Sequence, residues 1–348
     1  MKKVVICIIV SILMVVLTAC SNPYATGKKT DMHKTSNGNS GLHVEKVTHL
    51  TWAAGSLGGG WYSMAGGIAS IINKTNPKII IKTIPGGSLQ NIPFVENGTA
   101  QLAWEQPAFI KAAAQGEDPF KKKYPNIVAI GNGFGFNYFH FAVDANSKIN
   151  SIDEIFKKKI PIKIAVTPVN NTDEWVLRKV LDYYGVTYKD IKSWGGNIFH
   201  GSYTEQAEQF KNGNVDAMFT QLAIPGSAIT EASNGREMKI LPMSNDLIKY
   251  LSKYGIEKGI LPAGTYPKVV NGNKDIQTAM MGTILVTNKD VPDNVIYEIT
   301  KIINDNQERL PSIQAALKDY DIKKAVKNLG TDLHPGAKMY YKEMGIIK

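Results

Sequence analysis

The chain has almost no cysteine: among 348 residues only Cys7 and Cys20 are present. Because both lie near the N-terminus, the rest of the chain can form neither a disulfide framework nor a thiolate metal site. Catalytic signatures are missing as well: the sequence contains no G-x-S-x-G and no H-E-x-x-H, and its six histidines are scattered. We therefore expect no enzyme activity, no cofactor and no metal.

Long apolar runs are also scarce, and the one present lies at the N-terminus. Two lysines precede an apolar stretch from Val4 to Leu17, which ends in Leu-Thr-Ala-Cys at Cys20. A charged start, an apolar middle and small residues before a cut site are typical of a secretory signal peptide. An uncleaved membrane anchor is the alternative, but about 14 apolar residues are fewer than the ~20 that span a bilayer.

The end of this stretch also resembles the bacterial lipobox. That resemblance implies cleavage before Cys20, a diacylglycerol on its thiol, and a fatty acid such as palmitate on the new amine. Residues 1–19 are then a lipoprotein signal peptide. Residues 20–43 are predicted to be a flexible tether, because they are rich in Asn, Ser, Gly, Thr and Lys. We expect the protein on the outer face of the bacterial cytoplasmic membrane, anchored by lipid.

Acidic residues are outnumbered by basic ones, 30 to 40, which gives a formal net charge of +10. The lysines are scattered, which is typical of a solvated basic surface that can rest near anionic lipid. The extracytoplasmic compartment argues against nucleic-acid binding. The residues after the tether are numerous enough for one large or two medium domains.

Short β-branched runs alternate with amphipathic segments, which predicts an α/β fold with a largely parallel sheet and a mostly helical C-terminal third. The predicted strands are residues 49–53, 79–84, 101–104, 127–131, 139–143, 163–166, 217–220 and 238–242. The predicted helices are residues 61–73, 89–96, 152–156, 174–184, 203–212, 223–232 and 295–304.

Two glycine-rich turns, residues 55–62 and 85–91, each lie between a predicted strand and a predicted helix. Glycines there let backbone N–H groups converge on an anion at a helix N-terminus. Because neither turn has a nucleotide-binding signature, a carboxylate fits better than a phosphate. A tight turn without ligand, or simple capping by Ser88, is the alternative. After neighbouring parallel strands, the two turns would meet at the edge where α/β proteins bind ligands.

Several further segments occur in a fixed order along the chain. They are Asn97-Gly98-Thr99-Ala100-Gln101-Leu102-Ala103, Gly213-Asn214-Val215-Asp216-Ala217-Met218-Phe219, Ile260-Leu261-Pro262-Ala263-Gly264-Thr265-Tyr266 and Leu333-His334-Pro335-Gly336-Ala337. Together with the glycine turns, their order and spacing resemble the TAXI branch of solute receptors of tripartite ATP-independent periplasmic (TRAP) transporters. The resemblance covers residues 47–348.

The resemblance implies a periplasmic binding protein-like (type II) α/β fold, with two lobes, a hinge and a central ligand cleft. Lobe 1 would hold residues 44–142 plus 285–348, and lobe 2 residues 143–284. Such a receptor, which we expect to be a monomer, would capture a small carboxylate, either a glutamate-like amino acid or a dicarboxylate. It would deliver this ligand to a TRAP-type membrane permease. A receptor of an ATP-driven (ABC) importer and a surface adhesin or sensor lipoprotein are the alternatives.

The sequence departs from the family in the second lobe. Where such receptors tend to carry a Gly-Ser-Gly-Thr-like turn, this chain has Thr167-Pro168-Val169-Asn170-Asn171-Thr172-Asp173-Glu174-Trp175. Side-chain amides and hydroxyls replace backbone donors there. Asp173 and Glu174 could select a substrate ammonium group, as in an amino acid, or could simply favour the helix dipole.

We predict these ligand-binding residues: Ser56, Gly58, Gly59, Tyr62, Gly87, Ser88, Asn91, Gln106, Asn137, Thr172, Asp173 and Gln221. Tyr138 is a further cleft candidate. The loop at residues 132–137 is interpreted as hinge or cleft wall. His334 is assigned to packing rather than to chemistry.

Overall fold

The computed structural model describes residues 42–348. The predicted signal peptide (1–19), the lipidated Cys20 and nearly all of the tether (20–43) lie outside the described residues and stay predictions. Residues 42–348 belong to one compact unit. No helix within them is both long and apolar enough to cross a bilayer.

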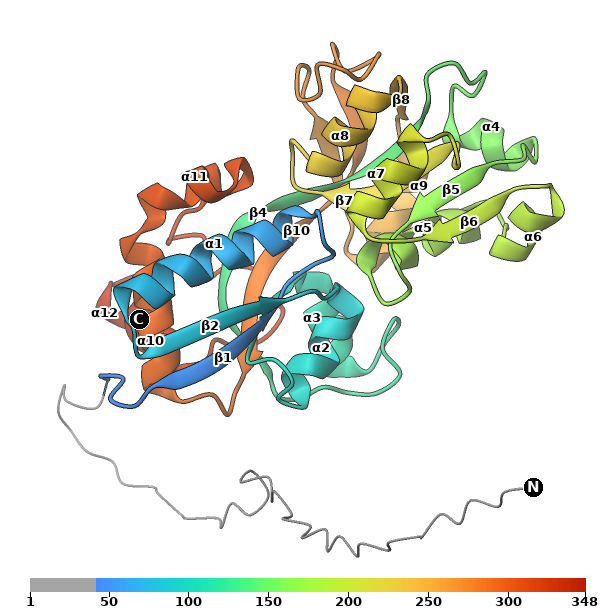
Figure 1. Cartoon of the computed structure of the whole chain (residues 1–348). Coiled ribbons are helices and arrows are strands. Elements are labelled where there is room, and N and C mark those ends of the chain that lie inside the picture. The colour runs from blue at the N-terminus through green and yellow to red at the C-terminus, as the bar shows by residue number, and fades with distance from the viewer. Residues whose placement is uncertain (1–41) are drawn as a thin grey trace, which may run out of the picture. The chain divides into compact units, whose positions relative to one another are not determined.

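The described residues form an α/β fold (Figure 1). The strands are β1 (Thr48–Ala53), β2 (Ile79–Ile84), β3 (Leu102–Glu105), β4 (Ile127–Asp144), β5 (Lys163–Val166), β6 (Asn197–His200), β7 (Ala217–Leu222), β8 (Met238–Leu241), β9 (Glu257–Leu261) and β10 (Ile276–Asn288). The α-helices are α1 (Gly60–Thr75), α2 (Ser88–Glu96), α3 (Pro107–Gln115), α4 (Ile152–Lys157), α5 (Thr172–Tyr183), α6 (Tyr188–Ser193), α7 (Tyr203–Lys211), α8 (Ser227–Gly235), α9 (Asn245–Leu251), α10 (Asp293–Asp305), α11 (Leu310–Ile313) and α12 (Pro335–Glu343). Short 3-10 turns are η1 (Ser252–Tyr254), η2 (Gln307–Arg309) and η3 (Ala315–Asp319).

The strands join in one mixed sheet of order β2-β1-β3-β10-β4-β7-β5-β6, with β8 on β4 and β9 on β10. The strands at both ends are parallel: β1 with β2 and β3, and β5 with β6 and β7. The central pairings of β4 and β10 are antiparallel. The prediction of a largely parallel sheet is therefore wrong for the middle of the sheet.

Two long strands carry the chain between the two halves of the sheet. β4 has 18 residues and replaces the two separate strands predicted at 127–131 and 139–143. The intervening segment, interpreted from sequence as hinge or cleft wall, continues as strand although Gly133 and Gly135 have positive φ angles of 88° and 84°. Only glycine adopts such angles without strain. The strand predicted at 238–242 is present as β8, but β9 and the second long strand, β10, were not predicted, so the expectation of a mostly helical C-terminal third is wrong for β9 and β10.

Helices cover the sheet and close the hydrophobic core. In one half, α1 and α10 pack on each other and α10 packs on α12, over the apolar side chains of β1 and β3. α10 supplies much of this core because its isoleucines recur at helical spacing, for example Ile296, Ile299 and Ile303. In the other half, α7 packs on α8 and α5 packs on α9. The result is two groups of elements joined by β4 and β10 (Figure 1).

His334 illustrates a residue that the fold uses for packing. Its side chain is fully buried; Nδ1 accepts a hydrogen bond from the amide of Gly336, and Nε2 lies 2.9 Å from the carbonyl oxygen of Val291. Burial lowers the pKa of His334, so the ring is neutral at pH 7. The prediction of a packing role is confirmed.

Candidate functional site

A small cavity lies where helices α1, α2 and α5 begin. It has room for the centres of a few water molecules, ≈ 30 Å³. Each of the three helices directly follows a strand of the sheet, so their N-termini meet at the carboxyl ends of β1, β2 and β5. The cavity is lined by Gly55, Ser56, Gly59, Gly60, Trp61, Gly87, Ser88, Asn137, Asn171, Thr172, Asp173, Tyr203 and Gln221.

The three helices begin without a capping side chain. Their N-cap residues are Gly59, Gly87 and Asn171, and none of these side chains accepts a hydrogen bond from its helix. By contrast, α4, α6, α7 and α9 each start at a Ser or Thr whose hydroxyl accepts such a bond. The first amides of a helix generally lack an acceptor within that helix, and each helix start carries a partial positive charge. In α2, however, the Leu89 amide already donates to the carbonyl oxygen of Asn170 at 3.2 Å and the Gln90 amide to that of Gly87 at 2.8 Å. The cavity is therefore electrostatically suited to an anion.

Direct hydrogen bonds cross the cavity between the two halves of the sheet. The hydroxyls of Ser88 and Thr172 lie 2.7 Å apart, and Gln106 Nε2 donates to Gln221 Oε1 at 2.9 Å. At the rim, the Ser227 hydroxyl donates to the carbonyl oxygen of Gly58 at 2.6 Å. These bonds link the start of α2 to the start of α5, and the residue after β3 to β7, so the structure has the two halves drawn together around the cavity.

Asp173 is the charged side chain of the cavity wall. It is buried, and its Oδ2 accepts hydrogen bonds from the main-chain N–H of Gln221 at 2.6 Å and from the Tyr203 hydroxyl at 2.8 Å. Burial raises the pKa of Asp173 to about 7, because the hydrogen bonds that favour the carboxylate only partly offset its desolvation. Its protonation state therefore responds to a charge placed in the cavity.

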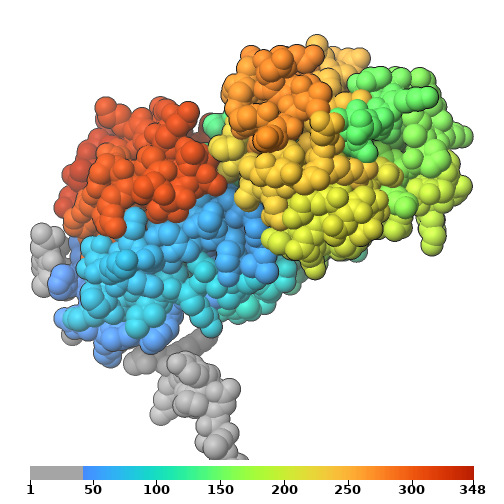
Figure 2. Space-filling model, turned by 45° about the horizontal axis from the view of Figure 1, so that its top comes forward, coloured from blue at the N-terminus to red at the C-terminus, as the bar shows by residue number. Residues whose placement is uncertain are grey.

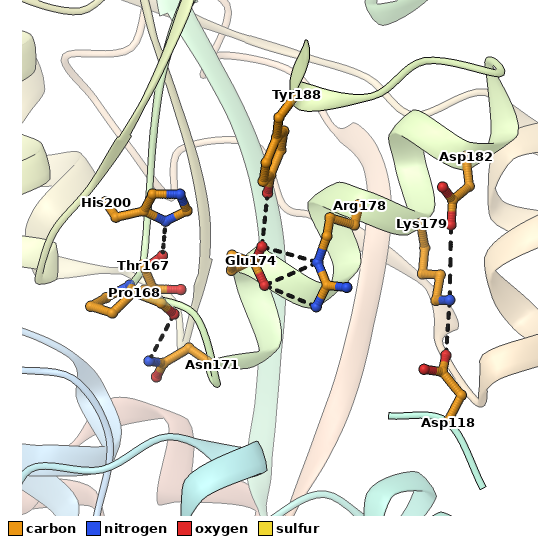
Figure 3. Close-up of polar contacts among 10 residues, drawn as sticks. All are labelled: Asp118, Thr167, Pro168, Asn171, Glu174, Arg178, Lys179, Asp182, Tyr188 and His200. Atoms are coloured by element: carbon orange, nitrogen blue, oxygen red, sulfur yellow. Dashed lines mark hydrogen bonds and ion pairs between the residues drawn. The ribbon is translucent and has the colours of Figure 1, made fainter. Parts of the chain in front are cut away.

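Glu174, the next residue, contacts Arg178 and Tyr188 (Figure 3). Its carboxylate forms a bidentate pair with Arg178 at 3.0–3.2 Å and accepts a bond from the Tyr188 hydroxyl at 3.1 Å. Glu174 is not among the lining residues of the cavity. Of the two acids considered for an ammonium group, only Asp173 faces the cavity, and Glu174 fastens α5 to the start of α6.

One lining residue carries a buried donor without a partner. Gln221 lines the cavity and is 7% exposed, and within residues 42–348 its Nε2 has no hydrogen-bond acceptor. An amide nitrogen that is buried without an acceptor costs free energy, which a ligand oxygen would offset. β4 and β10 form another part of the cavity wall. The side-chain amide of Asn137 and the indole of Trp61 both donate to the Thr283 hydroxyl, and these bonds fix that part in place.

The structure brings most of the predicted site residues together. Eight of them line the cavity: Ser56, Gly59, Gly87, Ser88, Asn137, Thr172, Asp173 and Gln221. Their contact with a ligand stays a prediction.

The other four predicted residues do not line the cavity. The carbonyl oxygen of the exposed Gly58 accepts the bond from Ser227, and Tyr62, within α1, packs against the core. Asn91 is fully buried and donates to the carbonyls of Ala54 and Trp104. Gln106 reaches the site through two lining residues: its Nε2 donates to Gln221 Oε1, and its Oε1 accepts from the Thr172 hydroxyl at 3.4 Å. Asn91 and Gln106 thus shape the site rather than line it, and Tyr138 lies on the opposite face of β4 from Asn137.

Sequence reasoning missed five lining residues: Gly55, Gly60, Trp61, Asn171 and Tyr203. The first four belong to turns that the sequence did single out. Tyr203 begins α7 immediately after β6, so the rule that found the glycine turns, a helix start after a strand, would have found Tyr203 had β6 been recognised.

Comparison with known proteins supplies the family. The chain belongs to the NMT1-like family. The match covers residues 52–345. Among solved structures, it is similar to the periplasmic binding protein BugD, with 14% identity and a TM-score of 0.51, over 87% of this chain and 94% of that one. It is also similar to a putative L-cystine ABC transporter from Listeria monocytogenes, with 12% identity and a TM-score of 0.47, over 79% and 98%.

The likeness to BugD supports the fold of this NMT1-like chain. It has the two-lobed α/β architecture of periplasmic binding proteins, as the sequence predicted. The TAXI subtype and the lobe boundaries stay predictions. Within residues 42–348 no cluster of side chains with metal-ligand chemistry is present.

Proposed function

We propose that this NMT1-like protein is an extracytoplasmic solute receptor that captures a small carboxylate in the cavity at the starts of α1, α2 and α5. The observation that carries the proposal is the convergence of three helix N-termini that lack capping side chains. A carboxylate would accept hydrogen bonds from their first-turn amides and from the unpartnered Nε2 of Gln221.

The charges of the cavity wall favour one class of carboxylate. The described lining residues include no Lys, Arg or His, and their one ionisable acid is Asp173. A dicarboxylate would bring two negative charges next to Asp173 without a cation to balance them. An α-amino acid would place its carboxylate at the helix starts and its ammonium at Asp173, and would be neutral overall. We propose a small zwitterionic amino acid as the ligand.

The proposal also covers the lipid anchor and the membrane transporter that receives the ligand. A lipid anchor at Cys20 would hold the receptor at the outer face of the cytoplasmic membrane, and the resemblance to TAXI receptors favours a TRAP-type permease as the partner. An ABC importer is the alternative partner, because this fold serves both systems. Expressing the receptor with each class of transporter and measuring ligand uptake separates the two.

The direct test is a calorimetric screen of amino acids and dicarboxylates. A specific ligand at about a thousand times its Kd should also stabilise the protein by about 4 kcal/mol in thermal unfolding. Ser88→Asp places a carboxylate at the start of α2, where it would compete with the ligand, so binding should be lost. A helix start favours an acidic residue, so the fold should persist.

Asn245→Asp is the matched control, since Asn245 is the exposed first residue of α9, away from the cavity. It adds the same charge to a helix start and should leave affinity unchanged. If Ser88→Asp binds as tightly as the control, the cavity is not the carboxylate site.

A further inference from the structure

A second and larger concavity lies on the opposite face of β4. Its volume is ≈ 930 Å³, within the range typical of small-molecule sites. Successive strand residues point to opposite faces, and accordingly Asn137 lines the ligand cavity while its neighbours Phe136 and Tyr138 line this groove. We call it the β4–β10 groove, because Met281 and Gly282 of β10 complete its floor.

The floor of the β4–β10 groove is apolar and partly open. Phe136 is 44% exposed, a high value for a large apolar side chain. Ala315 and Ala316 on one side and Ile224 and Pro225 on the other extend this apolar surface. A contiguous exposed apolar patch is a candidate binding surface, whereas single exposed apolar residues are ordinary.

One wall of the groove is basic. Lys318, Lys324 and Lys327 line it, and within residues 42–348 none of the three ammonium groups has a carboxylate within 4.0 Å. The amide of Asn132 holds this wall against β4 by donating to the carbonyl oxygen of Lys327 at 2.9 Å. Two acids, Asp319 and Glu257, also line the groove, so its lysines outnumber its carboxylates.

An apolar floor beside a basic wall matches one chemistry: a single negative charge at the end of an apolar chain. We propose that the β4–β10 groove is a second binding site, which takes a fatty-acid anion with its carboxylate at the lysine wall and its chain along Phe136. This site is separate from the carboxylate cavity and does not depend on the proposed function.

The groove also bridges the two halves of the sheet. Its walls come from η3 and residues 324–328 on one side, and from residues 224–225, just before α8, and residues 262–265 on the other. The orange-red C-terminal segment and the yellow-to-orange segments of the chain border each other in Figure 2. An occupant that touches both walls binds best at one separation of the two halves, so it would influence their movement.

The test is calorimetric titration of decanoate into the full chain held in lipid nanodiscs, with empty nanodiscs as the blank. We expect saturable binding of one decanoate per protein. Octanoate should bind about tenfold or more weakly, because each buried CH₂ changes affinity about fourfold. The uncharged 1-decanol should bind more weakly than decanoate.

Matched variants locate the site. The triple variant Lys318→Gln, Lys324→Gln and Lys327→Gln should weaken decanoate binding at least tenfold. The control variant Lys121→Gln, Lys122→Gln and Lys123→Gln removes the same charge from an exposed cluster outside the groove and should leave binding unchanged. Phe136→Ala should also weaken decanoate binding.

Three outcomes would overturn the proposal. Equal affinities of the two triple variants would remove the lysine wall from the site. Loss of decanoate binding in Ser88→Asp would show that decanoate binds in the carboxylate cavity instead. If the wall variant lost binding only to phosphatidylglycerol vesicles and kept its decanoate affinity, the wall would be a membrane-contact surface. Failure of amino acids to bind would count against the proposed function alone, since decanoate is measured independently.

Discussion

The hydroxyls of Ser88 and Thr172, the first residues of α2 and α5, meet at 2.7 Å across the cavity. Both side chains are buried, so this contact joins two helix starts that carry partial positive charge. It places the helix start of α2, in one half of the sheet, next to that of α5, in the other half. Such a contact can form only when the two halves are close together.

The Ser88–Thr172 contact should contribute measurably to holding the halves together. In a double-mutant cycle of Ser88→Ala and Thr172→Ala, we expect a coupling free energy of about 1 kcal/mol, the usual net value of a hydrogen bond. Urea unfolding of the wild type, the two single variants and the double variant measures it. Additive effects of the two substitutions would mean that the hydroxyls do not stabilise one another.

Ligand affinity should depend on pH through Asp173. Its pKa is raised to about 7 by burial, and a ligand ammonium beside it would favour the carboxylate. Affinity should therefore be constant above about pH 7 and should fall below it, because binding must then release a proton. Asp173→Asn should bind more weakly and lose this dependence. Affinity that falls above pH 7 instead would indicate an anion without an ammonium group.

The neighbouring groups do not reproduce this pH profile. Burial and the nearby Asp173 raise the pKa of Tyr203, so its phenol stays protonated throughout the range. Glu174 is paired with Arg178 and does not line the cavity. A profile with its midpoint near pH 7 that persists in Glu105→Gln and disappears in Asp173→Asn is assigned to Asp173.

Glu105 should lower the stability of the protein at neutral pH. It is fully buried on β3, and burial raises its pKa well above the ordinary value of 4.5. The main-chain N–H of Gln106, which donates to its carboxyl group, offsets this only in part. Above the ordinary value the unfolded chain releases this proton and the folded chain retains it, so the free energy of unfolding falls as pH rises.

Glu105→Gln removes the titration and keeps the size of the side chain. The variant should be more stable than the wild type at about pH 8, and the difference should shrink towards zero near pH 4. Urea unfolding at several pH values measures this. A difference that does not change with pH would show that Glu105 keeps the same pKa in both states.

The sequence predicted the local part of the site and missed the long-range part. The turns around Gly59 and Ser88 were found because glycine, strand and helix signals lie within ten residues of one another. The first half of β10, with Ala279, Met280 and Gly282, has little strand preference of its own, and the strand was missed although its second half, TILVT, is mostly β-branched. It forms a strand because β3, β4 and β9 pair with it, and those partners are distant in the sequence.

The separation of Asp173 from Glu174 shows the same limit. Adjacent helical residues point in different directions, so sequence alone indicated that the two acids diverge. Which of them faces the cavity depended on Arg178, one turn further along α5, and on Tyr203 and Tyr188, which begin other helices. Those contacts arise only after the sheet has assembled.

Capture of a small ligand should close the two lobes around the cavity at the helix starts. Small-angle X-ray scattering of the full chain in nanodiscs whose lipid is contrast-matched, with and without a calorimetrically identified amino acid, tests it most directly. The account predicts that ligand reduces the radius of gyration of the wild type and of Asn245→Asp, and leaves that of Ser88→Asp unchanged. A saturating ligand that binds the wild type without changing its radius of gyration would contradict closure around this cavity.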